Sequence, residues 1–124
     1  MIRVSLLITG AKNLFVSQKV FEFVKSFESK DRDGNAINKA IYKLQHLAKS
    51  GFIVDGETIK HEQSQIFRIR IMNTGRMIGF YEGNNFIALS CFLKKSQKLN
   101  KKQKGIIKKV EKIMKRKEWM YEIS

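Results

Sequence analysis

The stretch Phe67–Lys98, FRIRIMNTGRMIGFYEGNNFIALSCFLKKSQK, decides the predicted fold. Its first run alternates apolar side chains with Arg68 and Arg70. A strand here would carry the apolar side chains on one face and both guanidinium groups on the other. Turn sequences follow at 73–75 and 82–85, and each is followed by a further strand-like run. The stretch therefore predicts a three-stranded antiparallel meander.

The meander ends in a cationic segment. Its last run, 86–92, is apolar almost throughout, which is typical of a strand covered on both faces, and Lys94–Lys98 follows directly. Guanidinium and ammonium groups held on a rigid scaffold favour an anion site. We expect the sheet to bring six cationic side chains toward one region: Arg68, Arg70, Arg76, Lys94, Lys95 and Lys98.

Charge points to RNA as the anion. The 124 residues carry a formal net charge of +14, which favours nucleic acid as a partner. The hydrophobic fraction of 43% excludes a disordered polyelectrolyte. From Lys94 to Lys117 there are twelve Lys or Arg residues and one acid, Glu111. Four lysines of this segment are expected to contact RNA phosphates: Lys101, Lys102, Lys104 and Lys108.

The cysteine content and the absence of long apolar runs indicate the cellular compartment. The single cysteine, Cys91, cannot form an intrachain disulfide, which favours a reducing compartment. Its apolar neighbours predict a small buried side chain, not a catalytic thiol. The N-terminus lacks a signal-peptide pattern, and no run approaches the roughly 18 apolar residues of a membrane span. We expect a cytoplasmic protein of one domain, 1–124, that has no membrane partner.

Periodicity predicts the remaining elements and the fold class. They are a strand (2–9), a connection (10–15), a helix capped by Ser17 that ends near Ser29, a break (31–35), a helix (35–50) ended by Gly51, a loop (52–65) and a helix (100–117). The expected class is α+β. A small antiparallel sheet, made of the N-terminal strand and the three-stranded meander, would pack on an N-terminal helical hairpin, with a basic C-terminal helix.

Few other side chains suggest chemistry. His61, in the predicted loop, is a possible general base, whereas His46 is expected on a helix surface. Two isolated histidines and one buried cysteine argue against a zinc site. The sequence contains no Gly-x-Gly-x-x-Gly phosphate loop, and its acids are sparse. We expect neither a metal nor a cofactor.

The cationic segment has a recognisable pattern. The run Phe92–Lys98, FLKKSQK, together with Arg70 on the first meander strand and Arg76 opening the second, resembles the RelE/HigB toxins of bacterial toxin–antitoxin systems. It is most similar to their phage-derived Gp49-like branch. The resemblance extends from about Ile59 to Lys117.

The sequence departs from that branch at two positions. Asn100 stands where the branch usually has a proline, and Arg68 stands where many members have a glutamate. Tyr121 is the nearest match to a C-terminal tyrosine or histidine that some members use in catalysis.

The resemblance implies a RelE/ParE-like fold and a ribosome-dependent endoribonuclease. Such proteins enter the decoding site, where they are surrounded by ribosomal RNA, and cut messenger RNA. The implied protein partner is a cognate antitoxin, through which alone operator DNA would be bound.

The chemistry needs no metal. The 2′-hydroxyl of RNA can attack the adjacent phosphorus if a base removes its proton and cations stabilise the developing charge. Arg70 and Arg76 suit the stabilising role because a guanidinium pairs with two phosphate oxygens. Lys94, Lys95 or Lys98 could be the base if neighbouring cations lower its pKa, and the sequence does not choose between them.

Two alternatives stay open. ParE-type proteins share the implied architecture but inhibit DNA gyrase and lack the cationic catalytic cluster, so fold alone does not decide the function. A non-catalytic, basic RNA-binding module would use the same surface without cutting.

Overall fold

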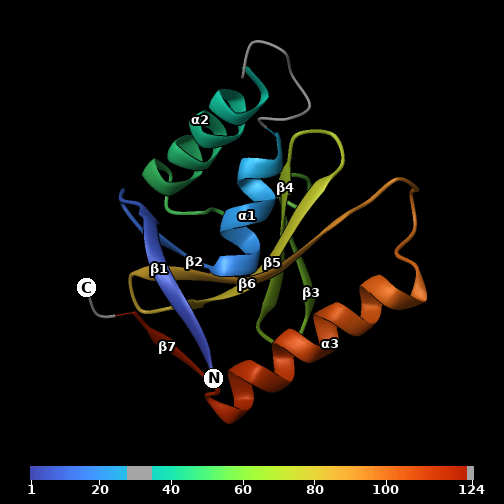
Figure 1. Ribbon diagram of the computed structural model, residues 1–124. Helices are drawn as coiled ribbons and strands as arrows, with labels where there is room; N and C mark the ends of the chain where they lie inside the picture. Colours follow the sequence, from blue (N-terminus) through green and yellow to red (C-terminus); the bar gives the residue numbers. More distant parts are fainter. Residues whose placement is uncertain (28–34, 123–124) are drawn as a thin grey trace.

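The computed structural model of the protein describes residues 1–27 and 35–122. Within them, seven strands and three helices follow one another along the chain (Figure 1). The strands are β1 (Ile2–Ile8), β2 (Asn13–Ser17), β3 (Ile59–Gln63), β4 (Ile66–Ile71), β5 (Gly75–Glu82), β6 (Asn85–Leu93) and β7 (Trp119–Tyr121). The helices are α1 (Gln18–Ser26), α2 (Asn35–Lys49) and α3 (Lys101–Arg116).

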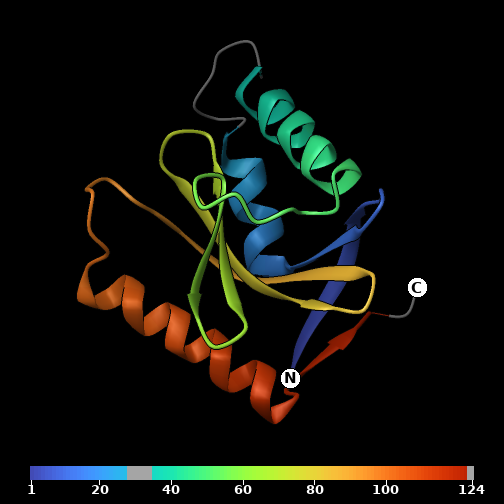
Figure 2. The same cartoon turned by 180° about the vertical axis from the view of Figure 1, so that it is seen from behind.

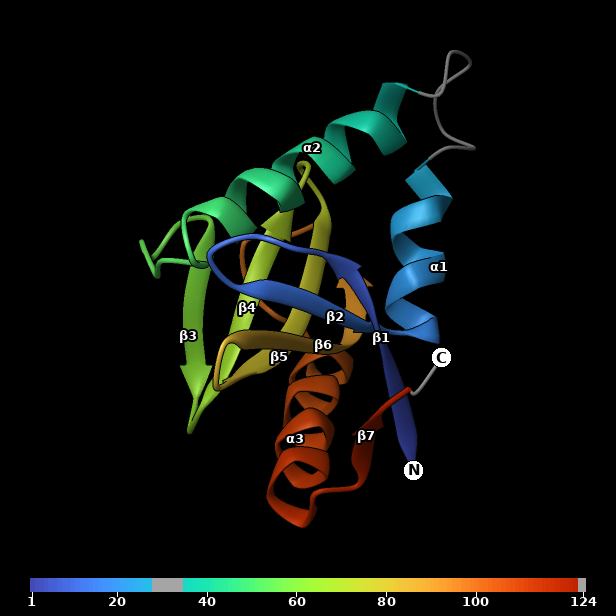
Figure 3. The same cartoon turned by 90° about the vertical axis from the view of Figure 1, so that its left-hand side faces the viewer.

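All seven strands belong to one mixed sheet in the order β3-β4-β5-β6-β2-β1-β7. Strands β3 to β6 form an antiparallel meander. Strand β2 pairs parallel with β6 and antiparallel with β1, and β1 pairs parallel with β7. Helices α1 and α2 lie on one side of the sheet and α3 lies on the other (Figure 3).

Each face of the sheet has its own hydrophobic core. The first core joins α1 and α2 to side chains such as Ile69, Ile71 and Met77. The second joins α3, through Ile107 and Val110, to the opposite face. Strand β6 is buried along nearly its whole length, as its apolar run predicts. Because both faces are covered, a charged side chain in the central strands reaches solvent only near the strand ends.

The predicted helix signals are confirmed. The hydroxyl of Ser17 accepts a hydrogen bond from the Val20 amide, at 3.2 Å, and begins α1. Asn100 and Gln103 form a capping box at the start of α3. Gly51 follows α2 with a φ of 78°, a conformation that glycine adopts without steric cost.

The predicted fold class is wrong. The prediction was a small antiparallel sheet packed on an N-terminal helical hairpin, in a RelE/ParE-like arrangement. The structure instead has a seven-stranded mixed sheet with helices on both faces. Helix α1 ends at Ser26, and the predicted break falls mostly on residues outside those described.

The prediction missed three strands, each for a physical reason. Strand β2 lies within and just after the predicted connection, and its last residue, Ser17, is also the cap of α1. Strand β3 lies in the predicted loop, and its polar side chains suit an edge strand. Strand β7 has only three residues and is formed by pairing with β1. None of the three has enough apolar alternation to be recognised alone.

No helix within the described residues has the length and apolar character that crossing a membrane requires.

Two glycines give a matched test of this packing. A Cβ at Gly79 would lie 2.0 Å from the Ile87 carbonyl oxygen, whereas a Cβ at Gly105, inside α3, would meet nothing within 4 Å. We expect Gly79→Ala to lower the free energy of unfolding by about 1–3 kcal/mol, because backbone must move. Gly105→Ala should raise it by about 0.5–1 kcal/mol through helix propensity. Urea unfolding measures both changes, and equal effects would contradict the described packing.

Candidate functional site

Three arginines lie on the sheet face that α3 covers. Arg70 on β4 is directly opposite Arg76 on β5, and Arg68 is two residues before Arg70. Ile66 and Ile78, which alternate onto the same face as these arginines, belong to the core under α3. The intervening residues Ile69, Ile71 and Met77 belong to the core under α1 and α2. The alternation predicted from sequence thus places Arg68, Arg70 and Arg76 on one face.

Arg76 is held rigidly. It is 8% exposed, and its Nη1 donates hydrogen bonds to the Gly75 oxygen at 2.8 Å and to the Asn73 oxygen at 3.2 Å. Burial lowers the pKa of Arg76, and the charges of Arg70 and Arg68 lower it further. The guanidinium nevertheless remains charged, because an arginine does not lose its proton in proteins. Its other N–H groups remain for an anion.

Lys94 completes the group at the end of β6. It lies two residues after Phe92, which is opposite Arg76, and its amide donates to the Thr74 oxygen at 2.7 Å. Burial lowers the pKa of Lys94, followed by the charges of Arg68, Arg76 and Lys60, while Glu62 acts in the opposite direction. A lowered pKa increases the neutral fraction of the amine, which is the form that can accept a proton.

Strand β3 adds two charged groups that sequence reasoning missed. Lys60 is paired with Arg68, and Glu62 Oε1 lies 3.1 Å from Arg68 Nε in an ion pair. The Arg68 and Glu62 side chains are 9% and 14% exposed. The spacing of Lys60 and Glu62 was the available signal, but residues 52–65 were interpreted as a loop. The sheet cluster is defined here as Lys60, Glu62, Arg68, Arg70, Arg76 and Lys94.

The sheet cluster carries five cations and one carboxylate, and this imbalance indicates an anion site. Like charges directly opposite each other, such as Arg70 and Arg76, destabilise a sheet. Partial burial strengthens that repulsion because water screens it less. A bound phosphodiester would relieve it.

Lys95 and Lys98 are in the exposed segment between β6 and α3, and neither is among the charges that affect the pKa of Lys94. The hydroxyl of Ser96 donates to the Lys98 oxygen at 2.9 Å, so this segment is locally ordered. The structure thus brings together four of the six predicted cations, Arg68, Arg70, Arg76 and Lys94.

The lysines of α3 are exposed on both sides of the helix. Lys101, Lys104 and Lys108 share one side, at the three- and four-residue spacing of neighbours on a helix. That side is the one from which Glu111 accepts a hydrogen bond from Gln63 on β3, where β3 and β4 cross α3 (Figure 2). Lys102 is on the other side of the helix, away from β3.

The two candidate bases outside the cationic segment, His61 and Tyr121, are not in the sheet cluster. His61 alternates with Lys60 and Glu62, so it is on the opposite sheet face, where its ring packs edge-on against Phe67. Tyr121 is on β7, at the far edge of the sheet from β3. Its hydroxyl accepts from Asn85 at 2.8 Å and donates to Glu82 at 3.1 Å, and burial raises its pKa.

Two further residues have the environments that the sequence suggested. Cys91 is 6% exposed, and burial raises the pKa of its thiol to about 11, so it is not activated as a nucleophile. His46 is exposed on α2. Across residues 1–27 and 35–122, no three His, Cys, Asp or Glu side chains are grouped to hold a metal.

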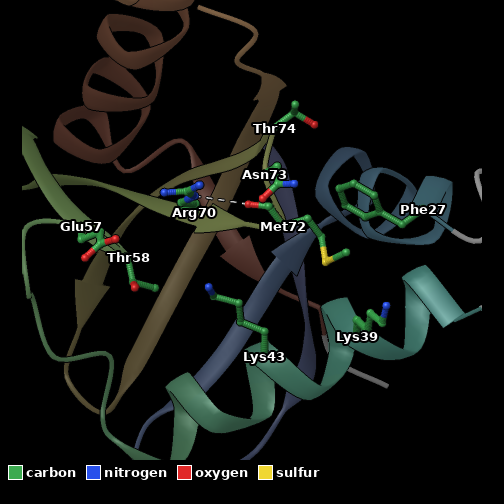
Figure 4. Close-up of a pocket in the computed structure, with 9 residues that line it drawn as sticks. All are labelled: Phe27, Lys39, Lys43, Glu57, Thr58, Arg70, Met72, Asn73 and Thr74. Carbon is green, nitrogen blue, oxygen red and sulfur yellow. Dashed lines mark hydrogen bonds between the residues drawn. The ribbon is translucent and has the colours of Figure 1, made fainter. Parts of the chain in front are cut away.

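A cavity of about 740 Å³ opens beside the sheet cluster (Figure 4). Arg70 belongs to both: it starts from the sheet face under α3, but its Nε donates to the Met72 oxygen at 3.4 Å, so the side chain turns toward the β4–β5 turn, where the cavity opens. The other walls come from α2, from the loop before β3 and from the β4–β5 turn: Lys39, Lys43, Glu57, Thr58, Met72, Asn73 and Thr74, with Phe27 at the end of α1.

No protein-family model matches the chain, and no curated protein matches its sequence.

The electrostatic coupling inside the sheet cluster can be measured directly. Because the Glu62 charge raises the pKa of Lys94, Glu62→Gln should lower that pKa further. We expect the shift in a ¹³C NMR titration of the Lys94 Cε resonance. Glu118→Gln, which removes an exposed carboxylate at the end of α3, is the control and should leave the Lys94 titration unchanged. An equal response to both substitutions would mean that Glu62 and Lys94 are not neighbours.

Proposed function

We propose that this protein is a metal-independent endoribonuclease that cuts messenger RNA by 2′-hydroxyl attack on the adjacent phosphodiester. One observation carries the proposal: three guanidinium groups and an amine of lowered pKa are gathered on one sheet face with a single carboxylate. This combination offers both charge stabilisation and a proton acceptor, which are the two requirements of the reaction.

In the proposed mechanism, Arg70 and Arg76 bind the non-bridging phosphate oxygens and stabilise the charge that develops on them. Neutral Lys94 accepts the proton of the 2′-hydroxyl. That oxygen then forms a bond to phosphorus, and the bond from phosphorus to the 5′-oxygen breaks. The leaving 5′-oxygen takes a proton from water, so the products are a 2′,3′-cyclic phosphate and a 5′-hydroxyl. The ion pair with Glu62 keeps Arg68 in place beside Lys94.

The resemblance of the cationic segment to RelE/HigB toxins supplies the proposed setting. The substrate would be messenger RNA in the decoding site of the ribosome. The exposed lysines of α3 would contact ribosomal RNA, because dispersed lysines bind phosphates without sequence preference. A cognate antitoxin would block the sheet cluster or its access, and operator DNA would be bound only through that antitoxin.

A non-catalytic RNA-binding protein is the second candidate. It is favoured by the positions of His61 and Tyr121, which supply no second proton-transfer group near Lys94. The two candidates differ in whether RNA is cut, and the following experiments separate them.

The first experiment removes the planar donor but keeps the charge. Arg76→Lys should reduce the cleavage rate on ribosome-bound messenger RNA by about a hundredfold to a thousandfold, the usual effect of losing one such donor. Ribosome affinity should change little, since many lysines contribute to it. Lys109→Ala, which removes an exposed lysine on the other side of α3, is the control and should cut normally.

Product analysis should find 2′,3′-cyclic phosphate ends and 5′-hydroxyl ends. RNA with 2′-O-methyl groups should resist, because its nucleophile is blocked. Binding without any cutting would favour the second candidate.

The second experiment tests Lys94 by its titration. Only the neutral amine accepts a proton. The cleavage rate should therefore rise as the pH approaches the pKa of Lys94 and level off above it. Glu62→Gln lowers that pKa, so the rising limb should move to lower pH. Lys94→Ala should abolish the limb, whereas Lys95→Ala should retain it. A pH profile that is the same in all four proteins would exclude Lys94 as the base.

A further inference from the structure

We infer that the cavity beside the sheet cluster binds the nucleotide next to the scissile phosphate and selects its base. This inference rests on the proposed ribonuclease activity, since it assigns the substrate's neighbouring unit to a second site. The volume of about 740 Å³ is within the range of small-molecule sites in proteins. Arg70 lines the cavity and faces Arg76 across the strand pair, so a chain held at the cluster would pass directly into the cavity.

The cavity has a place for a phosphate. Lys39 and Lys43 are four residues apart on α2 and therefore project from one side of that helix. In Figure 4 the Lys43 amine and the Arg70 guanidinium approach the cavity from different elements. Glu57 is the one acid among the lining residues. Three cations against one carboxylate would hold an anion more readily than a neutral ligand.

The cavity also has an apolar surface for a base. Met72 and Phe27 form one part of its lining (Figure 4). Met72 has a φ of 59°, a left-handed conformation that is costly for a residue with a long side chain. A glycine or asparagine would fit this turn at lower cost. The Met72 side chain packs against the core under α1 and α2 and also lines the cavity, so it offers a base an apolar surface of fixed position.

Polar groups on the opposite wall can discriminate between bases. The Glu57 carboxylate accepts hydrogen bonds only, and the Thr58 hydroxyl can donate or accept. Guanine carries two adjacent donors, N1–H and the exocyclic N2–H, whereas adenine, cytosine and uracil each carry one donor position beside an acceptor on the same edge. A carboxylate can accept from both guanine donors at once, so guanine would satisfy both oxygens of Glu57. The site should therefore favour guanosine.

This wall is already ordered before any ligand binds. Asp55 Oδ1 accepts hydrogen bonds from the amides of Glu57, Thr58 and Ile59, at 2.9, 2.7 and 3.1 Å. The Thr58 oxygen in turn accepts from the Arg70 amide at 2.7 Å. Little conformational entropy would be lost on binding, since the loop is fixed to the strand that carries Arg70.

The test uses the intact protein and the four 5′-mononucleotides as probes. Binding is followed by calorimetry and by the Met72 methyl resonance in ¹³C NMR. We expect GMP to bind more tightly than AMP, CMP and UMP, and all four to shift the Met72 methyl. Lys43→Ala should weaken their binding by about tenfold, the usual effect of losing one charged hydrogen bond. Lys49→Ala removes an exposed lysine of the same helix that does not line the cavity and is the matched control.

The base preference has its own variant. Glu57→Gln places an amide, which can donate as well as accept, at the discriminating position. The preference for GMP should then be lost, and cleavage sites in messenger RNA should lose their bias toward guanosine beside the cut.

The outcomes separate this inference from the proposed function. Equal weakening by Lys43→Ala and Lys49→Ala, or inorganic phosphate binding as tightly as AMP, would overturn the nucleotide site even if RNA is cut. Binding that depends on Lys43 and favours GMP, in a protein that cuts no RNA, would support the nucleotide site and refute the nuclease.

Discussion

The pairing of β4 with β5 places two guanidinium groups directly opposite each other, and the candidate site depends on this register. A shift of one residue would exchange the two faces of β4, placing its arginines in the core under α1 and α2, and Ile69 and Ile71 on the face under α3. The two hydrophobic cores prevent such a shift, because alternate side chains of the strand are buried in different cores. Hydrophobic burial on both faces therefore holds like charges together that would otherwise separate.

Helix α3 determines how open this cluster is. The Gln103 side chain, buried at the start of the helix, donates to the Leu93 oxygen at 2.9 Å and ties α3 to the end of β6. Further along, Gln63 and Glu111 join the helix to β3. The apolar side of the helix packs on the sheet, and its lysines are exposed on the other sides. One helix provides both the core of this face and its positive potential.

Arg70 connects the two parts of the proposed substrate site. It faces Arg76 within the sheet cluster and also lines the cavity under α2. The β4–β5 turn serves both parts as well, because its carbonyl groups hold Arg76 and Arg70 while the Met72 side chain faces the cavity. A substitution in this turn would be expected to affect phosphate binding and base selection together, so effects of Arg70 and Met72 variants should not be assumed additive.

The sequence by itself determined the local structure and the local chemistry. Alternation placed Arg68 and Arg70 on one strand face, the apolar run of β6 predicted burial on both sides, and Ser17 and Asn100 marked helix starts. These features depend on neighbours within a few residues, which is why they could be predicted.

Only the tertiary structure decided the sheet. Strands β2, β3 and β7 exist because distant strands supply their hydrogen bonds, and the mixed order depends on the parallel pairing of β2 with β6. The same holds for the site. Lys60 and Glu62 join it through the pairing of β3 with β4, and His61 and Tyr121 are excluded by sheet face and sheet edge, which local sequence does not specify.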